Sequence, residues 1–155
     1  MILDPQLMRS GEYNRFYKSL QFVLEHEGGY VYDSADPGGE TKWGISRRFH
    51  PTVDVKNLTQ EEAADIYYSE YWVPSGACLA DFPNCVAILD TAVNDGVSRC
   101  LSWGGSPFDL DSLLLNRTMY YIQIVKKNPA LQKFLGGWMS RVSDLKKYLL
   151  LAGTS

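Results

Sequence analysis

The sequence has few of the residues that build metal sites and disulfide scaffolds. Its three cysteines, Cys78, Cys85 and Cys100, form an odd set without regular spacing, so a disulfide framework is not expected. The two histidines, His26 and His50, stand at no metal-ligand spacing from a cysteine, which argues against a structural zinc site. We therefore expect no metal and no other cofactor, and free thiols if the protein works in a cytosol.

A secretory leader and long apolar runs are also missing. The first residues, MILDPQLMRSGEYNRF, contain no basic start followed by an apolar run, so they do not resemble a secretory signal. The longest apolar patch, YLLLAG at residues 148–153, is too short to span a bilayer. We expect synthesis in a cytoplasm and, if the protein acts on a cell wall, release through a pore formed by another protein.

What the chain does contain suits one globular domain over residues 1–155, because 45% of the residues are hydrophobic and 21% are charged. The charge is uneven: residues 117–155 hold seven basic residues and one acidic residue, whereas residues 1–116 hold eight and 17. The basic C-terminal part, about residues 109–151, is either a solvated helix face or a weak contact with an anionic wall or membrane. We expect a monomer and no nucleic-acid partner.

The hydrophobic spacing predicts a mainly helical protein with one small ribbon. Thr59 and Glu62 form a capping box, so a helix should begin there. A loop is expected at residues 103–107, and Gly136-Gly137 should mark a close helix contact or a kink. The predicted helices are Tyr13 to Glu27, QEEAADIYYSEYW after Thr59, Cys85 to Asp95, about Asp109 to Lys127, and Pro129 to Leu151.

The ribbon follows the first helix and carries the unusual residues, in the stretch HEGGYVYDSADPGGETKWGIS at residues 26–46. YVYD and KWGIS are expected to pair as an irregular hairpin around SADPGGET. An EF-hand is excluded, since the run lacks alternating Asp/Asn ligands and a closing Glu. A phosphate loop is excluded as well, because no Lys-Ser or Lys-Thr follows the glycines.

Glu27 lies at the start of this ribbon and on the apolar stripe of the preceding helix. At 100° per residue it falls within about 20° of Phe16 and Leu20. Burial and the negative end of the helix dipole both disfavour a charged carboxylate, so Glu27 is a candidate for an acid that stays protonated near neutral pH. A glycosidase needs such a group to protonate the leaving oxygen. The alternative is a partly exposed acid at a helix end.

Asp36 stands nine residues further on, in a Gly/Pro turn where it should stay ionised and serve as the base. Thr41 could hold a water with it. Tyr30, Tyr32 and Trp43 offer flat faces of the kind on which sugar rings stack. The alternatives are a turn-forming aspartate ahead of Pro37 and ordinary core aromatics.

Several segments resemble glycoside hydrolase family 108, a group of small peptidoglycan-cleaving lysozymes of phages and bacteria. EGGYVYDSADPGGETKWGIS is similar to the signature of the family, and LTQEEAADIYYSEYW is similar to its second helix. LDTAVNDG resembles a Phe-Asp-x-Ala-Val-Asn-x-Gly helix, with Leu89 in place of Phe. NPALQKFLGGWMSRV resembles the closing segment. The resemblance covers roughly residues 16–145 and implies a lysozyme-like α+β fold.

The resemblance also implies roles for individual residues. It places the general acid at Glu27, and the base or water-positioning group at Asp36 and Thr41. Phage-type lysozymes have Glu, eight residues, Asp, five residues, Thr; here the first gap is kept and the second is one residue short. Ser46 is the substitute hydroxyl if Thr41 is not the one used.

Asp90 and Asn94 are expected to form walls of the sugar groove, together with Tyr30, Trp43 and Ser46. Asn94 has an alternative as a helix C-cap beside Gly96. The chain departs from the family after Gly96, where VSRCLSWGGSPFDLDSLLLNR lacks the usual Asp-Gly and Gly-Pro-x-Thr elements. Because these elements are missing, the contribution of this region to peptidoglycan binding is an open question.

The function implied is a phage endolysin or related muramidase. It would hydrolyse the β-1,4 bond between N-acetylmuramic acid and N-acetylglucosamine in bacterial peptidoglycan and so lyse the cell. A non-catalytic wall-binding protein, a chitinase and a lytic transglycosylase remain alternatives. Inversion and retention stay open, because the separation of the two carboxyl groups is not fixed by sequence spacing.

Overall fold

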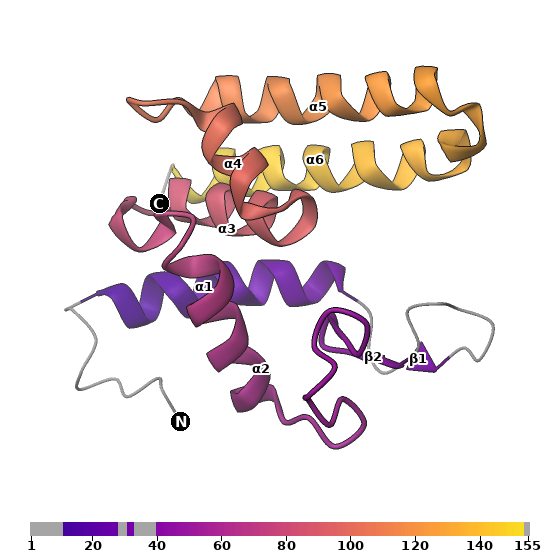
Figure 1. Cartoon of the computed structure of the whole chain (residues 1–155). Coiled ribbons are helices and arrows are strands. Elements are labelled where there is room, and N and C mark those ends of the chain that lie inside the picture. The colour runs from indigo at the N-terminus through magenta and orange to yellow at the C-terminus, as the bar shows by residue number, and fades with distance from the viewer. Residues whose placement is uncertain (1–10, 28–30, 33–39, 154–155) are drawn as a thin grey trace.

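A computed structural model describes residues 11–27, 31–32 and 40–153. The described part of the chain is mainly helical, with a small sheet after the first helix (Figure 1). The elements in order are α1 (Glu12–His26), β1 (Val31–Tyr32), β2 (Glu40–Lys42), β3 (Ile45–Ser46), α2 (Gln60–Tyr67), the π-helix η1 (Tyr68–Trp72), the 3₁₀-helix η2 (Ala77–Leu79), α3 (Asn84–Asp95), α4 (Val97–Gly104), α5 (Leu110–Lys127), the 3₁₀-helix η3 (Pro129–Leu131) and α6 (Gln132–Ala152).

Helix α3 is the centre of the fold. Its residues Cys85 to Ala92 are all buried, as expected for a helix that is apolar on nearly every side. It packs against α1, α4, α5 and α6, and in Figure 1 it lies between α1 and the pair formed by α5 and α6. The two charged residues that α3 buries, Asp90 and Asp95, therefore need partners from the surrounding helices.

Helix α1 confirms the helix predicted over residues 13–27. Phe16, Leu20 and Val23 are buried on one face, as their spacing indicates. The helix ends at His26, and Glu27 is the C-cap residue, with extended backbone and its N–H donated to the carbonyl of Val23. The glycines expected to stop the helix lie outside the described residues.

The helix α2 begins as predicted. Thr59 Oγ1 accepts from the backbone N–H of Glu62 at 3.2 Å, and Glu62 Oε2 accepts from the backbone N–H of Thr59 at 2.9 Å. This confirms the capping box. The predicted helix continues through YSEYW as the π-helix η1, which changes the side-chain direction and buries Trp72 completely.

The sheet is a three-stranded antiparallel meander in the order β1-β2-β3, rather than one irregular hairpin. Val31 pairs with Thr41, and Thr41 pairs with Ser46. The small hairpin expected after the first helix is confirmed by the pairing of β1 with β2. Its second strand is Glu40–Lys42, so only Lys42 of KWGIS belongs to that strand, and Ile45–Ser46 adds a third strand. Trp43 and Gly44 connect β2 to β3 with φ values of 53° and 74°. Positive φ at both central residues is the property of a type I′ turn, which matches the twist of the strands.

Three further differences concern the C-terminal half. Helix α4 was not predicted, and it extends through Trp103 and Gly104 into the expected loop. Helix α6 begins after the 3₁₀ turn at Pro129. A Cβ added at Gly136 or Gly137 would meet no atom within 4 Å, so these glycines do not mark a close helix contact. In the described part of the chain, every helix is too short or too polar to cross a membrane.

Candidate active site

Glu27 lies at the C-terminal end of α1, where the chain leaves the helix for the sheet (Figure 1). Its side chain is 24% exposed, so solvent and a ligand can reach it. Its Oε1 accepts a hydrogen bond of 2.7 Å from Nη1 of Arg141, a residue of α6. A charge-assisted bond of this length is among the strongest polar contacts that a protein makes.

The β2-β3 turn packs directly on Glu27. A Cβ built on Gly44 would lie 3.0 Å from Cγ and 3.2 Å from Oε2 of Glu27, and it would collide with the Tyr67 hydroxyl. Only glycine allows the backbone to approach this closely, and its φ of 74° also favours glycine. Tyr67 donates a hydrogen bond of 2.8 Å to the carbonyl of Trp43, which fixes the turn. The backbone of Gly44, in the KWGIS motif, therefore packs against the side chain of Glu27.

Two tyrosines line the same region. Tyr67 is buried, and burial raises its pKa, with a further contribution in the same direction from the negative charge of Glu27. Burial is also the main cause of the raised pKa of Tyr71, followed by the charges of Glu70 and Glu27. The two phenol rings lie 5.8 Å apart. Both hydroxyls therefore stay protonated at neutral pH, and the proton of Tyr67 is already donated to the carbonyl of Trp43.

Behind Glu27, alternating charges continue into the core. Arg141 Nε donates to Asp90 Oδ1 at 3.0 Å, and Arg141 Nη2 lies 2.8 Å from the same oxygen without hydrogen-bond geometry. Asp90 Oδ2 accepts from Nη1 of Arg117 at 2.6 Å. Arg117 Nε pairs with Asp95 Oδ2 at 2.9 Å. We call these five residues, Glu27, Arg141, Asp90, Arg117 and Asp95, the carboxylate–guanidinium ladder.

The inner end of the ladder has several polar partners, although Arg117 Nη2 is buried without a hydrogen-bond partner among the described residues. Tyr121 donates to Asp95 Oδ2 at 3.0 Å and accepts from Arg117 Nε at 2.9 Å. Thr91 Oγ1 accepts from Arg117 Nη1 at 3.3 Å. Burial is the largest influence on the pKa of Asp95 and raises it, against the lowering effect of Arg117 and Tyr121. Each buried charge thus has at least one oppositely charged partner, as burial requires.

The two predicted hydroxyl residues are neighbours. Thr41 and Ser46 are directly paired across β2 and β3, so their side chains share one face of the sheet. Ser46 Oγ is buried without a hydrogen-bond partner among the described residues, and so is Nε1 of Trp43. Asp36 and Tyr30, and the side chain of Tyr32, lie outside what the structure describes. Their proposed roles stay predictions.

Asp90 differs from its prediction as a wall of the sugar groove. It is 0% exposed, with both oxygens engaged by Arg141 and Arg117, so it can influence a ligand only through Arg141. Asn94 is exposed on the last turn of α3, where a ligand could reach it. The C-cap of that helix is Gly96, not Asn94.

Sequence reasoning missed Arg141 and Arg117, although a signal was present. Arg141 stands three residues after Trp138 and four before Leu145, on the apolar stripe of its helix. Arg117 stands four residues after Leu113 and four before Tyr121. Like Glu27, both arginines are charged residues on the apolar face of a helix. Two of the seven basic residues of the C-terminal part are thus structural partners and do not form a surface patch.

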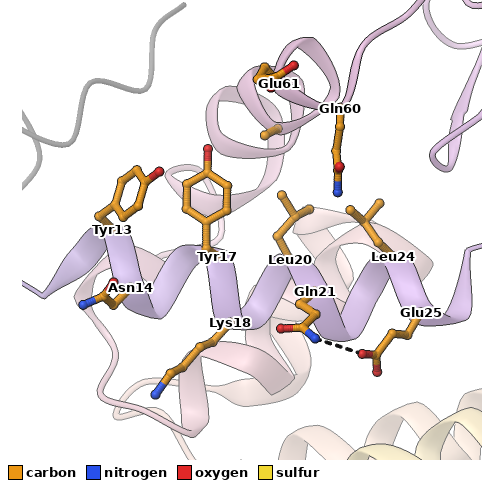
Figure 2. Close-up of a pocket in the computed structure, with 11 residues that line it drawn as sticks. Tyr13, Asn14, Tyr17, Lys18, Leu20, Gln21, Leu24, Glu25, Gln60 and Glu61 are labelled. Carbon is orange, nitrogen blue, oxygen red and sulfur yellow. Dashed lines mark hydrogen bonds between the residues drawn. The ribbon is translucent and has the colours of Figure 1, made fainter.

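A separate groove of about 940 Å³ lies between α1 and α2 (Figure 2). Tyr13, Tyr17, Leu20 and Leu24 point from α1 toward α2 in this view. Its carboxylates, Glu25 and Glu61, are exposed on the surface, and none of the predicted site residues lines it. The groove therefore lacks the half-buried acid that distinguishes Glu27. In the described ranges, no three His, Cys, Asp or Glu side chains gather to hold a metal ion.

Comparisons with known proteins identify a family and a similar fold. The model of the family described as glycosyl hydrolase 108 matches residues 20–96, a segment that contains Glu27, the sheet, α2 and α3. Residues 20–96 belong to glycosyl hydrolase family 108. This match suggests a glycoside hydrolase, and Glu27 is a carboxylate within the family 108 segment.

The fold agrees with a solved structure. The structure of Brucella abortus SagA matches with a TM-score of 0.71 and 25% sequence identity, over 92% of this chain and 97% of that chain. The likeness therefore extends through α5 and α6, beyond the family 108 segment. No curated protein sequence matches the chain significantly.

Proposed function

We propose that this family 108 protein is a muramidase that hydrolyses the β-1,4 bond between N-acetylmuramic acid and N-acetylglucosamine in bacterial peptidoglycan. The observation that carries the proposal is Glu27, a half-buried and reachable carboxylate held at the edge of the sheet inside the family segment. Glu27 donates its proton to the bridging oxygen, which leaves with N-acetylglucosamine as the bond to the muramic acid carbon breaks.

A second group must deal with the positive charge that develops on the sugar ring. We assign this role to Asp36, which either takes a proton from the attacking water or stabilises the ring charge. Thr41 and Ser46, which are paired across β2 and β3, would help hold that water. Water supplies the hydroxyl group of the new reducing end, and the released proton restores the acid–base pair over one turnover.

In the cell, we propose a role in wall lysis of the endolysin kind. The protein would be made in the cytoplasm, act as a monomer and reach the wall through a pore made by another protein. The exposed lysines of α5 and α6, Lys126, Lys127, Lys146 and Lys147, would add a weak contact with the anionic wall.

The test compares reducing-end release from purified peptidoglycan by the wild type and Glu27→Gln. We expect a loss of about 100-fold or more, because the amide cannot donate the catalytic proton. Glu25→Gln is the matched control: it removes an exposed carboxylate of the same helix, which accepts a hydrogen bond from Gln21, and it should keep full activity. Equal activity of wild type and Glu27→Gln would contradict the proposal.

The products distinguish the alternatives. New reducing ends on muramic acid indicate a muramidase, anhydro ends indicate a transglycosylase, and cleavage of chitin oligomers in preference to peptidoglycan indicates a chitinase. An Asp36→Ala variant that still cuts would favour the transglycosylase, which needs no activated water. Wall binding without any cleavage would make the protein a binding module on the same fold.

A further inference from the structure

Arg141 is the one cation within hydrogen-bond distance of Glu27 in the described chain, and it comes from 114 residues further along the sequence. Its side chain is 11% exposed, so it is nearly enclosed. One edge of the guanidinium contacts Glu27 and the other contacts Asp90. A planar guanidinium held on both sides has little freedom to rotate, so it imposes a direction on the carboxyl group that it touches.

The anchor of Arg141 is itself rigid. Asp90 belongs to the central helix α3 and is bonded on its other oxygen to the fully buried Arg117. Arg117 is bonded in turn to Asp95 and Tyr121. The orientation of Arg141 is therefore set by the packed core rather than by a flexible surface side chain.

In the ladder, the positive charge of Arg141 is shared between Glu27 and Asp90. An isolated guanidinium 2.7 Å from Glu27 would strongly favour the ionised carboxylate, which cannot act as a general acid. Asp90 shares that positive charge, and the whole ladder has three carboxylates against two guanidiniums. Among the described residues, the other titratable groups that face Glu27 are Tyr67 of α2 and Tyr71 of η1, both neutral at working pH.

We propose that Arg141 is a positioning residue for Glu27, which aims the acid at the glycosidic oxygen, and that Asp90 moderates the positive charge that Arg141 presents to it. The inference rests on the proposed function of Glu27 as the general acid. It assigns a task to two residues that contact no substrate, and to a helix outside the family 108 segment.

The test uses three variants of the full chain, with kcat, KM and the pH–rate profile measured on peptidoglycan fragments. In Arg141→Met we expect kcat to fall about 10- to 100-fold with KM within about twofold, because a misdirected acid slows the chemical step and leaves binding intact. The descending limb of the profile should move to higher pH, because the cation that favours the carboxylate is gone.

The other two variants separate direction from charge. Arg141→Lys keeps a positive charge but cannot bridge both carboxylates, so kcat should stay low while the descending limb stays near that of the wild type. Asp90→Asn removes the moderating charge, and the descending limb should move to lower pH, opposite to Arg141→Met. Arg48→Met, at an exposed arginine, is the matched control and should change neither quantity.

A readout independent of turnover keeps this proposal separate from the proposed function. The carboxyl carbon of Glu27, assigned by its loss in Glu27→Gln, is followed by ¹³C NMR during a pH titration. We expect opposite displacements of the midpoint in Arg141→Met and Asp90→Asn, whether or not peptidoglycan is cleaved. If either variant does not fold, the other and Arg141→Lys carry the test. Unchanged midpoints, or unchanged kcat in Arg141→Met, would overturn the proposal.

Discussion

Each end of α1 carries a glutamate, and the two side chains differ in exposure and in the charge of their partners. Glu12 in the first turn is 6% exposed, and its Oε1 accepts from the Tyr68 hydroxyl and from Trp72 Nε1, both at 3.1 Å. Its partners are neutral, and the positive end of the helix dipole favours its charge. Glu27 lies at the negative end, is partly exposed, and is held by a guanidinium.

This difference separates a carboxylate that stabilises the fold from one that is available for chemistry. Glu12 closes a contact between α1 and η1 and is sealed from solvent. Glu27 is partly exposed at the C-terminal end of the helix and is held there by Arg141 of α6. We therefore expect substitutions at the Glu12 end to change stability alone, and substitutions around Glu27 to change activity as well.

The largest effect on stability is expected from Arg117→Met, which breaks the inner part of the ladder. Removing this cation leaves Asp90 and Asp95 buried with one partner fewer each, at a cost of about 3–5 kcal/mol. Denaturant unfolding measures the loss, with Arg48→Met as the control. A loss below about 1 kcal/mol would mean that the ladder is not a structural unit.

A smaller effect is expected from Glu12→Ala, which leaves the donors of Trp72 and Tyr68 without this acceptor. We predict a loss of about 2–3 kcal/mol in the free energy of unfolding, with kcat unchanged for the folded protein. Glu12→Gln keeps an acceptor oxygen and should lose less than about 1 kcal/mol. A fall in kcat in either variant would remove the distinction between the two ends of α1.

The smallest effect is expected from Tyr67→Phe, which removes the hydrogen bond to Trp43 and should cost about 1 kcal/mol at pH 7. Because burial raises the pKa of Tyr67 above 10.0, the native state keeps the phenol proton longer than the unfolded chain. This contribution is complete below about pH 10 and is lost as pH rises toward the native pKa.

The wild type should therefore lose stability more steeply than Tyr67→Phe when the pH is raised above 10. Thermal unfolding at a series of pH values between 8 and 11 checks this difference. Parallel curves for the two proteins would show that Tyr67 is not the group responsible.

Much of the helical frame could be predicted from the sequence, because local spacing determines it. The stripe of Phe16, Leu20 and Val23 identified α1, and the Thr59–Glu62 box identified the start of α2. The anomaly of Glu27 on an apolar face drew attention to this residue, and the resemblance to family 108 selected it as the candidate acid. These signals depend on neighbours within a few turns, which a sequence displays directly.

The sheet and the partners of Glu27 could not be predicted in the same way. Trp43 carries a positive φ that its residue type does not suggest, so the KWGIS hairpin was missed. Helix α4 follows α3 after a single residue, Gly96, and was not separated from the expected loop. The contact between Glu27 and Arg141 spans 114 residues and depends on how α1, α3 and α6 pack.

The position of Arg141 on α6 has a consequence for how such chains can be recombined. The segment that carries the acid, residues 20–96, does not carry the cation that holds it. A crossover that joined this segment to a foreign C-terminal half would inherit the acid and lose its partner, unless the new half offered a guanidinium at the same point in space. Under the proposed role of Arg141, the interchangeable unit would therefore be the whole helical frame and not the family segment alone.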